Sequence, residues 1–135
     1  MKQEDKELLL QDLSARLPYG VKVKFAIPAL LVSVRNDRDG IKIITESTYS
    51  EHIYNIEDIK PYLRPMSSMT EEEKKEYQSL CVIHSDHDAD DNVTYYYFDT
   101  VESIDWLNKN MFDFRELIPK DLALSTEILN PYNND

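Results

Sequence analysis

The segment VKVKFAIPALLVSVRNDRDGIKIIT, residues 21–45, decides the fold, because its apolar and polar side chains follow the pattern of short strands. In VKVKF (21–25) the valines and the phenylalanine face one side of an extended chain and the lysines face the other, which is typical of a half-buried strand. ALLVSVR (29–35) and IKIIT (41–45) predict two more strands, and NDRDG (36–40) between them predicts a tight turn. Strands in such close succession predict an antiparallel sheet.

The sheet is expected to continue beyond residue 45. A polar loop over 46–51 precedes HIYNI (52–56), which predicts a fourth strand. Pro61 and Pro65 follow, and because proline cannot donate to a strand ladder, residues 60–65 predict an edge piece at most. About 45 residues are too few for a sandwich, so a small curled barrel or a strongly bent sheet is expected.

Helices are expected on both sides of the strands. Leucines spaced along residues 4–16 predict an N-terminal helix, which Pro18 and Gly20 end. Thr70 and Glu73 have the spacing of a capping box and predict a helix over 67–81. Its apolar face comprises Tyr77, Leu80, Cys81 and His84, which places the end of the helix near His84.

The rest of the chain predicts a strand, a helix and a tail. VTYYYF (93–98) predicts the strand, and Asp99 with Glu102 predicts a second capping box for a helix over 99–110. Trp106, Phe112 and Phe114 are the aromatic side chains expected to join this half to the first, and residues 125–135 are expected to fray.

The predicted fold class is therefore α+β. An N-terminal helix and a small antiparallel SH3-like β-barrel or bent sheet occupy residues 1–65. An acidic helix–strand–helix lobe occupies residues 66–135 and packs on the first part, either as a second domain or within one continuous domain.

The charge is distributed unevenly. Residues 1–65 hold ten Lys/Arg and ten Asp/Glu, whereas residues 66–135 hold five and sixteen, so the whole net charge of −11 falls in the second half. This asymmetry indicates either a need for solubility or an acidic surface for a basic protein partner. No Lys/Arg cluster is present, so direct binding to DNA or RNA is not expected.

The compartment follows from cysteine usage and hydropathy. Cys81 is the single cysteine, which excludes an intramolecular disulfide and fits a reducing environment. The first residues lack the apolar run of a signal peptide, and no segment reaches the roughly 18 apolar residues of a membrane span. A cytoplasmic protein without membrane association is expected.

The stretch IHSDHDADDN (83–92) is the candidate for metal chemistry. An EF-hand is disfavoured, because its turn glycine is replaced by Asp91 and its bidentate glutamate by Tyr97. The residues that could ligate a transition metal are His84, His87, Asp86, Asp88 and Asp90. Their setting instead predicts a solvated acidic connector between a helix and a strand, without a defined metal site.

No catalytic constellation is found in the sequence. Cys81 and His84 could form a nucleophilic pair on one helical face, but no orienting or oxyanion group accompanies them. Gly20 and Gly40 are the only glycines, so a glycine-rich phosphate loop is impossible. We therefore expect neither an enzyme nor a bound cofactor.

Two resemblances add context. The order of GVKVKF, ALLVSVR, GIKIIT and IEDIKPYLRP resembles small SH3-like or Tudor-like barrels, in which aromatic residues at the barrel mouth often bind peptides or nucleic acids. In this chain the aromatic residues that the resemblance implies for such a mouth are Tyr49 and Tyr54. LPYGVKV, IKPYLRPMSSMTEEEKKEY and ESIDWLNKNMFDFRELIPKDLAL resemble a family of small uncharacterised proteins from gut Bacteroidales and their phages or mobile elements. The resemblance to that family implies an association with phages or mobile elements, and it implies no particular activity.

The functional expectation is a non-enzymatic protein-interaction module with an acidic partner surface. The candidate partner-binding residues are Asp86, Asp88, Asp90, Asp91, Tyr49 and Tyr54. The alternative is a phage-type acidic inhibitor that mimics nucleic acid and occupies the basic cleft of a host protein.

Overall fold

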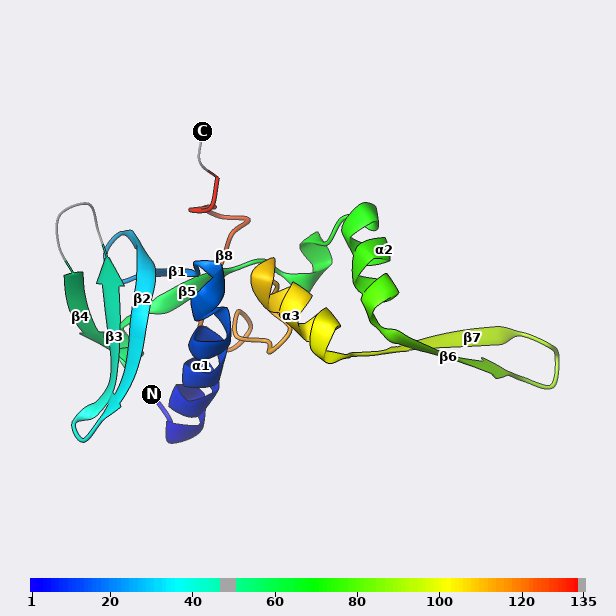
Figure 1. The fold of residues 1–135 in the computed structure, drawn as a ribbon, viewed down its shortest axis with the longest axis horizontal. Coiled ribbons are helices and arrows are strands. Elements are labelled where there is room, and N and C mark those ends of the chain that lie inside the picture. The colour runs from blue at the N-terminus through cyan, green and yellow to red at the C-terminus, as the bar shows by residue number, and fades with distance from the viewer. Residues whose placement is uncertain (47–50, 134–135) are drawn as a thin grey trace.

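The computed structural model of the chain describes residues 1–46 and 51–133, with residues 47–50 and 134–135 outside the described part (Figure 1). It has the α+β architecture that the sequence predicts. The elements are α1 (Gln3–Arg16), β1 (Lys22–Lys24), β2 (Pro28–Asp37), β3 (Gly40–Glu46), β4 (Glu51–Asn55), β5 (Lys60–Leu63), α2 (Glu71–Leu80), β6 (Val82–His87), β7 (Val93–Phe98), α3 (Val101–Lys109) and β8 (Leu124–Ser125).

Six strands form one bent sheet in the order β4-β3-β2-β1-β5-β8, and all neighbours are antiparallel except β5 and β8. The predicted strands of residues 21–56 are confirmed. Asp37 pairs with Gly40 across a two-residue turn, and Gly40 has φ 118°, a conformation that residues with a Cβ rarely adopt. A 3₁₀ turn over Ile56–Asp58 leads from β4 into β5, which returns to pair with β1.

The expectation that residues 60–65 form only an edge piece was wrong, because β5 lies between β1 and β8. The two neighbours pair with different halves of the strand. Lys60 and Pro61 pair with β1, whereas Tyr62 and Leu63 pair with β8. Pro61 pairs with β1 and has no partner in β8. On the side of β8, therefore, the missing N–H of the proline interrupts no ladder.

The hydrophobic core lies between the sheet and α1 (Figure 1). Leu9 and Leu13 of α1 are fully buried against apolar side chains of the sheet such as Val23 and Ile43. The same cluster contains Met111, Leu117, Leu122 and Ala123, which come from the second half of the chain. Apolar residues from both halves therefore share one core.

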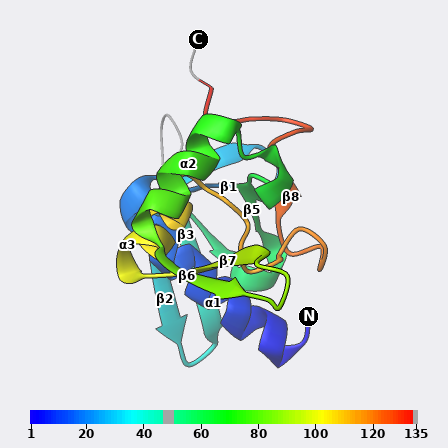
Figure 2. The ribbon, with the colours of Figure 1, turned by 90° about the vertical axis from the view of Figure 1, so that its right-hand side faces the viewer.

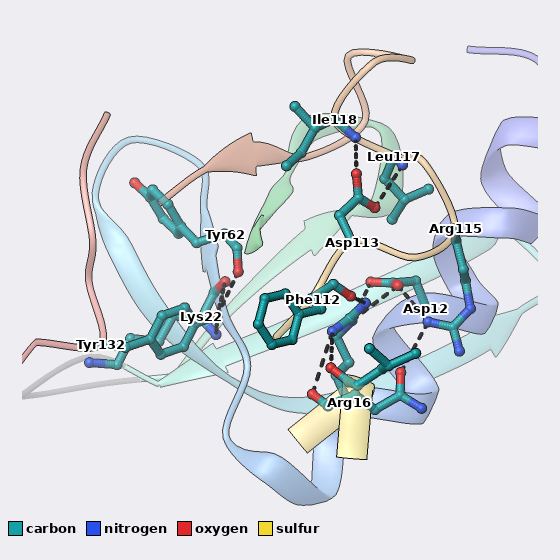
Figure 3. A network of polar contacts seen from close by, with 12 residues as sticks. Asp12, Arg16, Lys22, Tyr62, Phe112, Asp113, Arg115, Leu117, Ile118 and Tyr132 are labelled. Carbon is teal, nitrogen blue, oxygen red and sulfur yellow. Dashed lines mark hydrogen bonds and ion pairs between the residues drawn. The ribbon is translucent and has the colours of Figure 1, made fainter. Parts of the chain in front are cut away.

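Arg16, the last residue of α1, is fully buried and connects α1 to the far end of α3 (Figure 3). Its Nε donates to both carboxylate oxygens of Asp12, at 3.0 and 3.1 Å. Its Nη2 donates to the Phe112 carbonyl at 2.6 Å, and its Nη1 reaches the carbonyls of Leu107 and Asn108 at 3.5 and 3.4 Å. These carbonyls also accept backbone N–H groups, so the guanidinium adds a second donor at the C-terminal end of α3.

A second cation completes the buried cluster. Arg115 Nη1 donates to Asp12 Oδ1 at 2.6 Å, so the carboxylate of Asp12 faces two guanidinium groups. Both arginines also lie over the ring of Phe114, at 4.2 Å for Arg115 and 5.7 Å for Arg16. Burial lowers the pKa of Arg16 and Asp12 opposes that shift, but a guanidinium stays protonated at any physiological pH.

Phe112 links the sheet to the helices, as the sequence suggests for the aromatic residues of this region. Its fully buried ring stacks on Trp106 at a centroid distance of 5.5 Å, and the Arg64 guanidinium lies 4.1 Å from its centroid. The Arg64 N–H donates to the Met111 carbonyl, and the Asp113 N–H donates to the Arg64 carbonyl. The chain after α3 is thereby tied to the end of β5.

The helix boundaries confirm one capping box and correct another. Thr70 and Glu73 cap α2 as predicted, but α2 ends at Leu80 and not near His84. The cap of α3 is Thr100 with Ser103, not Asp99 with Glu102. Asp99 is engaged elsewhere, because its Oδ1 accepts hydrogen bonds from the hydroxyls of Tyr77 and Ser103.

The expectation of a fraying C-terminus was wrong as far as Tyr132. The Tyr132 hydroxyl donates to the Tyr62 carbonyl at 2.8 Å and accepts from the Lys22 N–H at 2.9 Å, which bridges β5 and β1 (Figure 3). Burial raises the pKa of Tyr132 to about 12. One aromatic anchor holds the tail against the sheet.

Replacing Arg16 by Met should destabilise the fold by about 3 kcal/mol or more, because buried Asp12 loses one of its two cations and three buried carbonyls each lose one of their donors. The matched control is Arg35→Met, which removes an exposed arginine that pairs with Asp37 at 3.2 Å and should cost less than about 1 kcal/mol. Urea unfolding of both variants measures the difference. Equal stabilities would contradict the central position given to Arg16.

Stability should also depend on the charge of Glu73. Hydrogen bonds from Arg64, at 2.7 and 2.8 Å, are the main cause that lowers the pKa of Glu73 from 4.5 to about 2. A carboxyl whose pKa is lower in the folded state stabilises the fold above its unfolded pKa. That contribution is therefore complete above about pH 4.5 and disappears as the pH falls toward 2.

Glu73→Gln should consequently be about 1–2 kcal/mol less stable than the wild type at pH 6, and the gap should close as the pH falls from 4.5 to 2. Glutamine can still form the capping box, so the difference in stability between Glu73→Gln and the wild type reports the effect of the carboxylate charge. Glu76→Gln in the same helix is the control and should follow the wild type. A gap that does not vary with pH would contradict this assignment.

Candidate functional site: the β6–β7 arm

Strands β6 and β7 form a hairpin, residues 82–98, that we call the arm. It is a two-stranded sheet separate from the six-stranded one, with a regular register from Val82 opposite Phe98 to His87 opposite Val93. The arm projects from the ends of α2 and α3, away from the rest of the molecule (Figures 1 and 2). Every residue of both strands is exposed.

The arm corrects the expectation for residues 83–92, which were predicted to be a solvated connector. Residues 83–87 belong to β6, and only the remainder forms the tip. The strand at 93–98 is confirmed, and it explains the difference. The aromatic side chains of β7 favour an extended partner, and they impose on the polar sequence of β6 a conformation that its own pattern does not indicate.

The two faces of the arm differ in composition. Because directly opposite residues of an antiparallel pair share a face, one face contains Ile83, Val93, Tyr95 and Tyr97 together with Ser85 and His87. We call the first four residues the tyrosine face. Their exposed fractions are 55% for Ile83, 39% for Val93, 60% for Tyr95 and 42% for Tyr97. The opposite face carries Val82, His84, Asp86, Thr94, Tyr96 and Phe98.

The tip of the arm is organised by Asp88. Its Oδ1 accepts the N–H groups of Asp90 and Asn92 at 2.8 and 2.9 Å, and its Oδ2 accepts the Asn92 side-chain amide at 3.1 Å. These bonds, chiefly from Asn92, lower the pKa of Asp88. Asp91 has φ 60°, a left-handed conformation that Asp and Asn tolerate in turns. The hydrogen bonds of the tip thus favour the ionised form of the Asp88 carboxylate.

The arm and its surroundings contain acidic residues and no lysine or arginine. Between residues 76 and 108 the acidic residues are Glu76, Asp86, Asp88, Asp90, Asp91, Asp99, Glu102 and Asp105. No lysine or arginine in this range offsets their charge. Four of these acids, Asp86, Asp88, Asp90 and Asp91, lie in the arm itself, and the other four lie in α2, in α3 or at the root of the arm.

The root of the arm is fixed to both neighbouring helices. The Tyr77 hydroxyl of α2 donates to Asp99, which follows β7, and the Thr100 hydroxyl donates to the Leu80 carbonyl at 2.7 Å. Burial, together with the hydrogen bond to Asp99, raises the pKa of Tyr77. The Tyr77 ring also contacts Trp106 at a centroid distance of 5.8 Å. The arm is anchored at this end only.

The structure separates the partner-binding candidates into groups. Asp86, Asp88, Asp90 and Asp91 all lie in the arm. Tyr54 lies in β4, far along the chain from the arm, where its half-buried ring stacks on Phe25 at 4.5 Å and packs against the core. Tyr49 lies outside the described residues. The tyrosines of β7 were not among the candidates, although three consecutive tyrosines in one predicted strand were visible.

The residues considered for metal or nucleophilic chemistry are not brought together. His84 and His87 lie on opposite faces of the arm, and His84 Nε2 is 3.5 Å from Asp86 Oδ1. Cys81 follows the end of α2, so it shares no helical face with His84, and its thiol donates to the Tyr77 carbonyl. Among the described residues, no three His, Cys, Asp or Glu side chains form a group that could hold a metal ion.

A separate hollow of about 310 Å³ lies beside β8. Its lining is mainly apolar and comprises Lys24, Ala26, Pro28, Tyr62, Leu124, Ser125, Ile128 and Leu129. It therefore offers an apolar surface and no pair of carboxylates or imidazoles for acid–base chemistry.

No helix in the described part of the chain has the length and apolar character needed to cross a membrane.

Comparison with known proteins yields no relative: no family model, no curated protein and no solved structure matches the chain. The function must be argued from the geometry of the arm.

Proposed function

We propose that this protein is a non-enzymatic interaction protein and that the arm is the element with which it binds a basic protein partner. The observation that carries the proposal is the exposure of every strand residue of a hairpin rich in large apolar side chains. Those side chains are Val82, Ile83, Val93, Tyr95, Tyr96, Tyr97 and Phe98.

The physical argument concerns the cost of leaving this surface in water. A two-stranded hairpin is marginally stable alone, and sheets usually gain stability from further strands or from a packed face. Each large apolar side chain gains about 1.5–3 kcal/mol when it is fully buried. Contiguous exposed apolar surfaces commonly mark interaction sites, and tyrosine is enriched where interfaces are strongest. A partner that covers the tyrosine face would supply the missing burial.

The charge of the arm supports a basic partner. Acidic residues without a neighbouring lysine or arginine attract a positive surface and raise the rate of encounter. The exposed tyrosine rings add a second attraction, because cations bind to the faces of aromatic rings. An acidic inhibitor that occupies a nucleic-acid-binding cleft is one form of this function, and competition by DNA for the captured partner distinguishes it.

Substituting the tyrosine face should abolish partner binding. Ile83→Thr, Tyr95→Thr and Tyr97→Thr together retain strand-forming residues but remove three of the four apolar side chains of the tyrosine face. We expect the affinity for partners captured from the native lysate to fall by about 100-fold or more. The stability of the fold should change by no more than about 0.5 kcal/mol, because these side chains are exposed.

The matched control replaces three exposed isoleucines outside the arm, Ile27, Ile53 and Ile128, by threonine; their exposed fractions are 65%, 61% and 90%. This variant should bind like the wild type. Mass spectrometry of the captured proteins and calorimetry with the purified partner provide the readout. Undiminished capture by the arm variant would contradict the proposed function.

The acids of the arm should control the rate of association. Asp86→Asn, Asp90→Asn and Asp91→Asn remove three charges, whereas Asp88 is kept because it holds the tip together. The association rate should fall by about tenfold at low ionic strength, and its dependence on salt should flatten. Stopped-flow or surface-based kinetics across a salt series measure both effects.

Glu7→Gln, Glu46→Gln and Glu127→Gln form the charge-matched control, since these exposed acids lie outside residues 76–108. Their loss should alter the rate far less. If both triple variants slow association equally, net charge alone is responsible and the arm has no special part in steering.

A further inference from the structure

We infer that the outer edge of β7 binds an extended segment of the basic partner by strand addition, which deepens the proposed function and rests on it. In this mode the partner contributes a third strand to the arm. Main-chain hydrogen bonds supply affinity, and the side chains of the added strand select the partner.

The first observation is an unpaired sheet edge. β6 and β7 form a sheet of two strands, so each strand pairs along one side only in the described structure. Along the other side, alternate N–H and C=O groups point outward, which is the template that an added strand requires. No bulge interrupts the register between Val82–Phe98 and His87–Val93, so the edge is regular over its full length.

The second observation selects β7 over β6. Proteins protect exposed edges with charges, proline, bulges or coverage by another element. β6 carries Asp86 and two histidines, whereas β7 consists of valine, threonine, three tyrosines and phenylalanine. β7 thus has no charge, proline or glycine and a high preference for extended structure. The edge left without protection is the edge suited to pairing.

The third observation defines the incoming segment. Asp91 lies just before β7 and Asp99 just after it, and both are exposed. Seven residues separate them, of which Val93–Phe98 are extended, so the two acids lie about 20–27 Å apart. A segment with Lys or Arg at each end of a similar span places opposite charges at both acids, whichever direction it runs. A second copy of the arm would bring further acids, so charge favours a basic partner over self-association.

The probe is a peptide of about nine residues in which valine and threonine alternate between two terminal lysines, a span that matches the two acids. The control peptide has the same residues and charge, but two consecutive central residues are N-methylated, so neither of its edges can pair there. Both are titrated into the full chain and into the variant with Asp86, Asp90 and Asp91 replaced by Asn. Intermolecular NOEs locate the bound peptide.

Strand addition predicts that the unmethylated peptide binds at least about tenfold more tightly than the methylated one. Its backbone should give NOEs to the amides of β7 and none to those of β6. Replacing the three aspartates should weaken both peptides by a similar factor, because it changes charge and not pairing. Without peptide, sedimentation should show a monomer.

Equal affinity for the two peptides, absence of binding, or NOEs to β6 would each overturn strand addition. A dimer that pairs through β7 in the absence of peptide would overturn it as well, because the occupant would be a second copy. None of these results contradicts the proposed function, which is tested separately by the captured partner and the tyrosine-face variant. Undiminished capture of the partner by the tyrosine-face variant would contradict both.

Discussion

The buried guanidinium of Arg16 is the interaction on which the rest of the structure depends. Removing a charge from water costs several kcal/mol unless it is paired and hydrogen-bonded. Asp12 provides the pairing from the preceding turn of α1, and the carbonyls of Leu107, Asn108 and Phe112 provide the remaining acceptors. These groups meet only when α3 ends against α1. One cation thereby fixes α3 relative to the sheet, and α3 begins where the arm ends.

The same arrangement explains why the arm is supported at its root and nowhere else. Asp99 and Thr100 connect the arm to α2 and α3 through hydrogen bonds, whereas β6 and β7 have no buried residue. The six-stranded sheet and the helices, which we call the body, therefore fix the orientation of the arm at its root and leave both of its faces exposed. A partner that binds an element already held in direction loses less conformational entropy than one that binds a flexible loop. Under the proposed function, the exposed surface of the arm would be stabilised when a partner covers it.

Local patterns predicted the parts of the fold that local physics decides. Alternation gave the strands of residues 21–56, and the spacing of Thr70 and Glu73 gave the cap of α2. The errors concern features that depend on residues distant in sequence. His84 lies in a strand opposite Tyr96, β5 is internal because β8 pairs with its residues Tyr62 and Leu63, and Tyr132 is anchored through Tyr62. Within the arm, the sequence offered the aspartates as binding candidates but not the tyrosine face, because the exposure of apolar residues cannot be read from composition.

Native-state hydrogen exchange across a series of low denaturant concentrations tests the central claim most directly. If the body fixes only the root of the arm, amides of β6 and β7 should exchange through a local opening of low free energy that hardly depends on denaturant. Amides of α1 and β3 should require global unfolding, with a steep dependence on denaturant. The contradicting result is a common free energy and a common slope for the arm and the core, which would mean that the body stabilises the arm along its length and that no partner is needed to cover it.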